Sequence, residues 1–165
     1  MDSRPCRSVL TRPLWAGLVI SIAACTSAPV AFDPLDPMAI AQVDSTLQAA
    51  MAGARAANAE LALSAVARGD DFGFITGDVM LTGYDQILAT FRQTYAGIES
   101  QEQTVLESRI RLIAPDVAIW AAVGEGQYTD KAGHTPEPVG MGNSVVLVRR
   151  DGVWRVVHFH QSIAR

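Results

Sequence analysis

The sequence predicts an α+β domain in which helices come first and an antiparallel sheet follows. Three observations support this class. Apolar residues recur at helical spacing over residues 38–51, strand-like alternation fills much of the chain from residue 104 onwards, and Asp151-Gly152 has the composition of a tight hairpin turn. This order of elements favours helices packed on one face of a sheet.

The composition is that of one globular domain with a short extension. The chain has 165 residues, of which 49% are hydrophobic and 18% are charged, so it has enough apolar material for a core. Its net charge is −4, and its basic residues are scattered along the sequence. Nucleic acid is therefore not expected as a partner, because its phosphates require a basic surface.

Residues 1–24 have the pattern of a bacterial export signal. Three arginines precede an apolar run, residues 14–24, that is too short to span a bilayer comfortably. The run ends in IAAC, residues 22–25, which resembles a lipobox, the motif whose cysteine is acylated and becomes the first residue. We therefore expect a lipoprotein signal peptide over residues 1–24 and lipidation at Cys25. The alternative is an ordinary secretory signal in which Cys25 is incidental.

Residues 25–37 are predicted to be the lipidated cysteine and a tether, because residues 26–37 hold three prolines and little that forms a regular element. Cys6 leaves with the signal, so the mature chain holds Cys25 alone and gains no stability from a disulfide. These features predict an exported protein, periplasmic or on the cell surface, that a lipid anchors to a bacterial membrane. The folded domain is expected over residues 38–165.

The N-terminal half of the domain is predicted to be helical. Asp36 is a suitable N-cap, and Pro37 suits the first helical position. A second helical stretch, residues 58–70, follows Gly53, a residue that can interrupt a helix. The apolar stripe of the first helix consists of Ile40, Val43, Leu47 and Met51.

The remaining pattern predicts a small hairpin, one more helix and then long antiparallel strands. The hairpin is expected over residues 72–83 and the helix over residues 84–98. The predicted strands cover residues 104–113, 117–130, 143–150 and 153–162, with turns or loops at residues 114–116, 131–140 and 151–152. Residues 117–124 are apolar on both faces, so that strand requires cover on both sides.

Two histidines on the last strand raise the question of a metal site. Strict alternation puts Trp154, Val156, His158 and His160 on one face, and Arg155, Val157, Phe159 and Gln161 on the other. A His-x-His pair can offer two nitrogens to one ion, but a site needs at least a third ligand, from His134 or a carboxylate such as Glu125. We predict no metal and no cofactor, and we interpret the histidines mainly as packing residues.

Four stretches resemble the nuclear transport factor 2-like (SnoaL-like) superfamily, most closely the association domain of calcium/calmodulin-dependent protein kinase II and its bacterial relatives. They are TGYDQILATF, SRIRLIAPDVA, QYTD and RRDGVWRVVHFHQS, at residues 82–91, 108–118, 127–130 and 149–162. The resemblance implies a cone-shaped roll, in which a strongly curved, mostly antiparallel sheet wraps around N-terminal helices and leaves a pocket at its open end. This is the nuclear transport factor 2-like or cystatin-like fold.

The resemblance also implies a homodimer or a larger ring, formed through the outer face of the sheet. It further places pocket arginines at three positions of the kinase association domain, which here hold Gly124, Val145 and Gln161. Arginine clamps carboxylates through two hydrogen bonds, and these three residues cannot. The pocket is therefore expected to prefer a small organic ligand that is neutral or weakly polar.

The predicted ligand-pocket residues are Trp120, Tyr128, Phe159 and Gln161, although Trp120 and Phe159, each taken alone, are better explained as core residues. Enzymes of the superfamily move a proton with a carboxylate or a histidine, so the catalytic candidates are Glu125, Tyr128, His158 and His160. Glu125 and Tyr128 have opposite parity along the strand and share a pocket only if a bulge redirects one of them. Two functions stay open: a ligand-binding domain, with or without isomerase- or dehydratase-like activity, and a non-catalytic module for homo-oligomerisation or protein interaction.

Overall fold

The structure is a computed structural model that describes residues 31–164. The predicted signal peptide, Cys25 and the first part of the predicted tether lie outside these residues. The end of that tether contacts the domain, because the carbonyl of Pro34 accepts a hydrogen bond from the backbone N–H of Leu112 at 3.4 Å. Among the described residues, no helix has both the length and the apolar character needed to cross a membrane.

Helix α1 covers Pro37–Arg55 and begins as predicted. The Asp36 carboxylate accepts hydrogen bonds from the backbone N–H groups of Met38, at 2.9 Å, and Ala39. Gly53 does not interrupt the helix. It lies in the last turn, where a side chain would collide with the backbone of Ala62, so this glycine lets the next segment pack closely against α1.

The predicted helix over residues 58–70 is wrong beyond its first turn. Helix α2 covers only Ala59–Ala62. After it, the backbone N–H of Ala67 donates to the carbonyl of Val156 at 2.8 Å, and the N–H of Val156 donates to Ala65 at 2.9 Å. These bonds to the last strand replace those that a continuing helix would make, which a local helical pattern does not reveal.

The hairpin and the following helix agree with the prediction. After a short 3₁₀ turn, η1 (Gly69–Asp71), strands β1 (Gly73–Thr76) and β2 (Val79–Thr82) form an antiparallel pair. Helix α3 then covers Tyr84–Tyr95. Tyr84 and Ile87 are its buried residues, so they attach the helix to the core.

Four long strands complete one six-stranded sheet with the order β2-β1-β6-β5-β4-β3. They are β3 (Ile98–Ala114), β4 (Val117–Asp130), β5 (Val139–Arg150) and β6 (Val153–Ile163), and β3 and β5 begin earlier than predicted. All pairings are antiparallel except that of β1 with β6. The α+β class and the mostly antiparallel sheet are therefore confirmed.

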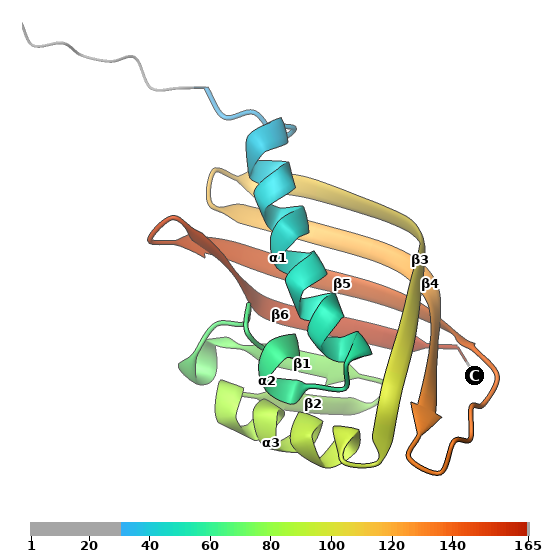
Figure 1. Ribbon diagram of the computed structural model, residues 1–165. Coiled ribbons are helices and arrows are strands. Elements are labelled where there is room, and N and C mark those ends of the chain that lie inside the picture. The colour runs from blue at the N-terminus through green and yellow to red at the C-terminus, as the bar shows by residue number, and fades with distance from the viewer. Residues whose placement is uncertain (1–30, 165) are drawn as a thin grey trace, which may run out of the picture. The chain divides into compact units, whose positions relative to one another are not determined.

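The sheet is strongly curved and the helices lie on its concave side. Figure 1 shows α1 running across this face and the long strands β3 and β4 bending partway along their length. A register shift lies in β3 between Val105 and Glu107, where an extra residue increases the local bend. The concave face is packed around Val43, Val145 and Leu147, which are almost fully buried.

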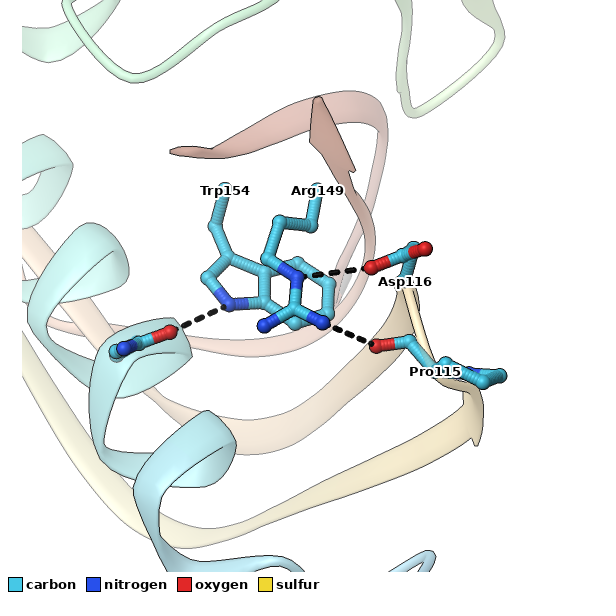
Figure 2. A network of polar contacts seen from close by, with 5 residues as sticks. Pro115, Asp116, Arg149 and Trp154 are labelled. Atoms are coloured by element: carbon cyan, nitrogen blue, oxygen red, sulfur yellow. Dashed lines mark hydrogen bonds and ion pairs between the residues drawn. The ribbon is translucent and has the colours of Figure 1, made fainter. Parts of the chain in front are cut away.

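A polar network around Trp154 joins three segments of the chain. The Arg149 guanidinium lies over the Trp154 ring, 5.5 Å from its centre, and donates to the Asp116 carboxylate at 2.8 Å and to the carbonyl of Pro115 at 3.2 Å (Figure 2). The indole N–H of Trp154 donates to Gln42 on α1 at 3.3 Å. These contacts tie the β3–β4 turn to the β5–β6 hairpin and to α1.

Candidate functional site

A hollow lies on the concave side of the sheet beside the C-terminal part of α1. Its volume is about 50 Å³, which is room for a few water molecules or for one small organic group. Residues of α1 and of the four long strands line it. They include Met51, Gln103, Val105, Trp120, Ala122, Glu125, Met141, Asn143, Phe159 and Gln161.

The lining of the hollow is mostly apolar and carries little charge. Its polar side chains are mainly amides, those of Gln103, Asn143 and Gln161. Glu125 is the one titratable residue in the lining, but it has the parity of Ala121 and Val123 on β4, so its exposed side chain points away from the concave face. None of the lining residues is lysine, arginine or histidine. The hollow therefore has no cationic side chain in its lining that could pair with an anion.

One wall of the hollow is fixed by a row of aromatic rings. The ring of Phe159 stacks on Phe74 with centroids 5.3 Å apart and 17° between the planes. Phe74 meets Phe91 edge-on at 5.3 Å, and Phe91 meets Tyr95 at 5.4 Å. Burial raises the pKa of the Tyr95 hydroxyl, and a hydrogen bond with the Gln101 side chain acts in the opposite direction. Phe159 is thus held in place independently of any ligand.

The amides of Gln161 and Asn143 are poorly satisfied. The Nε2 group of Gln161 donates to the thioether sulfur of Met141 at 3.3 Å, and its Oε1 accepts from the Thr76 hydroxyl at 3.4 Å. A thioether is a weak acceptor. The Oδ1 atom of Asn143 is buried, and no residue within 31–164 donates a hydrogen bond to it. Leaving such an oxygen without a partner costs about 1–3 kcal/mol.

Strand β6 does not alternate strictly. Its pairing with β5 skips Val157. Val156 and His158, which would share a face on a regular strand, therefore point to opposite faces of the sheet. Trp154 and Val156 are buried, and Phe159 packs against the same core. The prediction that Trp154 and Val156 share a face with the two histidines is therefore wrong, because a one-residue bulge reverses the facing of a strand.

His158 and His160 lie on the outer face of the sheet, opposite Val146 and Ser144 of β5. They do not line the hollow, so the structure does not bring these two catalytic candidates to it. His160 instead lines a groove on the outer face. Within residues 31–164, no three His, Cys, Asp or Glu side chains gather as a metal site would require.

The structure separates the remaining catalytic candidates. Tyr128 is 43% exposed and does not line the hollow, whereas Glu125 does. No register shift interrupts the pairing of β4 with β5 from Val117 to Gly126, so no bulge at Gly124 or Gly126 redirects either side chain. Trp120, Phe159 and Gln161 do lie together at the hollow, and Trp120 is also part of the core.

The two glycines of β4 are explained by close approaches. A side chain at Gly124 would collide with the carbonyl oxygen of Thr104, so the backbone of β3 crosses β4 closely at the bend. A side chain at Gly126 would meet the end of Met141. The flexible Met141 side chain therefore fills part of the space beside Gly126.

Sequence reasoning missed Gln103 and Asn143 as lining residues. Asn143 has the same parity on β5 as Val145 and Leu147, which are both buried, and this shared parity was the available signal. Gln103 lies before the predicted start of its strand at residue 104, so strand alternation does not predict which face of the sheet its side chain is on.

The outer face of the sheet carries an uncovered apolar strip on β4. Ala121 is exposed and Val123 is 52% exposed. They border a groove of about 450 Å³ that Glu107, Arg109 and His160 also line. The prediction that β4 is apolar on both faces is confirmed, and within the described residues no helix covers the outer one.

The family model of the calcium/calmodulin-dependent protein kinase II association domain matches residues 72–165, more than half of the chain. The chain belongs to this family. The match begins just before β1 and includes α3 and all four long strands of this association domain. Comparison with curated proteins gives no match.

Solved structures with the same fold come from several bacteria. A nuclear transport factor 2-like superfamily protein from Salmonella enterica has a TM-score of 0.70 and 15% identity over 78% of this association domain's chain and 93% of its own. A proposed calcium/calmodulin-dependent protein kinase II association domain from Xanthomonas campestris has a TM-score of 0.62 and 21% identity over 84% of this chain and 92% of its own. A ketosteroid isomerase-like protein from Erwinia carotovora has a TM-score of 0.63 and 17% identity over 76% of this chain and 95% of its own.

Proposed function

We propose that this association domain is a self-associating module that pairs with a second copy through the outer face of its sheet. The observation that carries the proposal is the uncovered apolar strip of Ala121 and Val123 beside the outer groove. A strand that is apolar on both faces requires cover on both, and the helices of this chain cover one. Membership in a family of association domains supports a second copy as the other cover.

The charges around the outer groove are compatible with a two-fold pair. Glu107 and Arg109 carry opposite charges and both line the groove. In a two-fold interface, residue i of one copy contacts residue j of the other and the reverse contact also forms. Arg109 of each copy can therefore lie opposite Glu107 of the other without leaving like charges in contact.

The molar mass of the purified protein in solution tests this proposal. We expect wild type to have at least the mass of a dimer at micromolar concentration, and Val123→Lys to shift the mass towards the monomer because it buries a charge at the interface. Met38→Lys is the matched control, since Met38 is 71% exposed on α1. A monomeric wild type over the whole concentration range would reject the proposal.

A second candidate function is the binding of a small neutral organic ligand in the hollow. The unpartnered amide oxygen of Asn143 favours it, because a ligand with a hydrogen-bond donor would satisfy this atom. Proton transfer at the hollow, as in an isomerase or a dehydratase, has less support, because Glu125, its one titratable lining residue, is exposed and has the parity of the outer face. A thermal-shift screen of small molecules on wild type and Gln161→Leu tests binding. We expect wild type alone to be stabilised, and no shift with any compound would reject this role.

We further propose export and lipid anchoring through Cys25, from the signal-like residues 1–24 and the IAAC motif. Cys25→Ser should abolish incorporation of labelled palmitate and release the protein from the membrane fraction, because the thiol is the acylated group. Cys6→Ser is the matched control, since this cysteine lies within the segment that is removed. Unchanged labelling of Cys25→Ser would contradict the anchor.

A further inference from the structure

Two amide side chains face each other across neighbouring strands at the hollow. Asn143 of β5 and Gln161 of β6 are direct partners in the register of this antiparallel pair. The Cβ atoms of such partners are about 4.5–5.5 Å apart and their side chains leave the sheet on the same face. Both residues line the hollow, so their amides can contact one ligand group together.

Both amides have hydrogen-bonding capacity to spare. The Nε2 group of Gln161 donates to the sulfur of Met141, which is a weak acceptor, so a ligand oxygen would replace this contact. Asn143 Oδ1 has no donor among residues 31–164. Asn143 lines the hollow, and the terminal torsion of its amide is broad, so the amide can adjust to a ligand at little cost. One acceptor and one donor are thus available side by side.

The surroundings restrict the group that this pair can hold. Trp120 and Phe159 supply flat apolar surface, and the stacking of Phe159 on Phe74 keeps it rigid. The hollow of about 50 Å³ takes one small group and no large ring system. No lysine, arginine or histidine lines the hollow, so nothing in the lining would offset the charge of a carboxylate ligand.

We infer that Asn143 and Gln161 together recognise the adjacent N–H and C=O of a neutral amide, such as a lactam, an imide or a primary carboxamide. Asn143 Oδ1 accepts from the N–H of the ligand, and Gln161 Nε2 donates to its carbonyl oxygen. This inference rests on the ligand-binding role proposed for the hollow and adds the ligand class. It is independent of self-association.

Titration followed by the indole N–H signals in NMR tests the inference on the purified protein. The probes are 2-pyrrolidinone, cyclopentanone and propionate, which share a similar size but offer an N–H with a C=O, a C=O alone and an anion. We expect 2-pyrrolidinone to bind about tenfold more tightly than cyclopentanone, because the ketone leaves the Asn143 oxygen unpaired. The Trp120 signal should move, whereas that of Trp154, which is bonded to Gln42 away from the hollow, should not.

Substitutions in the pair provide the second arm of the test. Gln161→Leu and Asn143→Leu should each reduce the affinity for 2-pyrrolidinone to that for cyclopentanone, with the Trp154 signal unchanged as evidence of folding. If Asn143→Leu fails to fold, Gln161→Glu replaces it, because a carboxylate removes the donor without removing the side-chain shape.

The outcomes separate this inference from the proposed ligand-binding role. If no probe moves the Trp120 signal, the ligand-binding role fails and the inference fails with it. If cyclopentanone or propionate binds as tightly as 2-pyrrolidinone, the hollow binds ligands but the amide inference is overturned. Binding of 2-pyrrolidinone that Gln161→Leu leaves unchanged would overturn it as well.

Discussion

Asn143 and Gln161 are polar residues on strand faces whose other members pack in the core. Val145 and Leu147 share the face of Asn143 on β5 and are almost fully buried. An amide at such a position lowers stability unless it is fully hydrogen-bonded, and Asn143 Oδ1 is not. A residue that lowers stability in this way is best explained by a role in binding, which connects the packing of β5 to the proposed function.

The stability of Asn143→Leu tests this interpretation. Leucine has a similar size and leaves no polar atom unpaired, so we expect the free energy of unfolding to increase by about 1 kcal/mol. Asn58→Ala is the contrasting change, because Asn58 Oδ1 accepts from the Leu61 N–H at 2.9 Å at the start of α2. Its loss should reduce stability by about 1 kcal/mol. Chemical denaturation measures both, and a destabilised Asn143→Leu would show that the amide is satisfied in solution.

Gly124, like Gly53, is a glycine whose replacement should be harmful. A methyl group there would overlap the carbonyl oxygen of Thr104, a backbone atom that cannot move aside alone. We expect Gly124→Ala to cost about 2–3 kcal/mol. Gly97→Ala is the matched control, because nothing lies within 4 Å of the added carbon and its φ is ordinary. Denaturation midpoints of the two variants measure the difference, and equal stabilities would contradict the close approach of β3.

At the scale of elements, α1 and α2 differ in what determines their length. The start of α1 is a local event, since the Asp36 carboxylate and Pro37 lie next to the first turn in the sequence. The end of α2 is not local, because Ala65 and Ala67 bond to Val156 of β6, far along the chain. The helical pattern of residues 58–70 therefore predicts the first turn and fails where a distant strand supplies the partners.

The contact between α3 and the start of β3 should be sensitive to alkaline pH. Burial raises the pKa of Tyr95 above its ordinary value of about 10. The folded state therefore holds this proton more tightly than the unfolded state, and the stability gained is complete below the unfolded pKa. It is lost as the pH rises through the folded pKa.

Unfolding measured at a series of pH values around and above 10 tests this. Wild type should lose stability over this range, and Tyr95→Phe should lose less, because it has no hydroxyl to ionise. Tyr128→Phe is the control at an exposed tyrosine and should follow the wild-type profile. Parallel profiles for Tyr95→Phe and wild type would contradict the assignment.

At the scale of the whole molecule, the two faces of the curved sheet serve different purposes. The concave face holds the core and the hollow, and the helices close it. The outer face exposes Val123 and carries Glu107, Arg109 and His160 around a groove. The proposed ligand binding belongs to the concave face and the proposed self-association to the outer face, while Val123 and Asn143 border both the hollow and the groove.

Self-association predicts that thermal stability depends on protein concentration. If folding and pairing are linked, the Tm of wild type rises with concentration by mass action. Val123→Lys should have a Tm that is nearly independent of concentration, and Met38→Lys should behave like wild type. Calorimetry over about a hundredfold range of concentration measures this. A wild-type Tm that does not change would indicate that the domain is stable as a single chain.

The sequence by itself determined the features that depend on neighbouring residues. Asp36 at the start of α1, the hairpin of β1 and β2, the Asp151-Gly152 turn and the two apolar faces of β4 all follow from local pattern, and the motif around His158 and His160 led to the correct family. The lipid anchor at Cys25 stays a prediction from the sequence.

Tertiary structure decided which side chains meet. The bulge at Val157 reverses the facing of β6, so His158 and His160 point outward while Phe159 and Gln161 reach the hollow. Strand register depends on pairing across many residues, and one skipped residue exchanges the two faces of a strand. Alternation along the chain cannot reveal that residue, because the bulge arises from the fit of β6 to β5 on a strongly bent sheet.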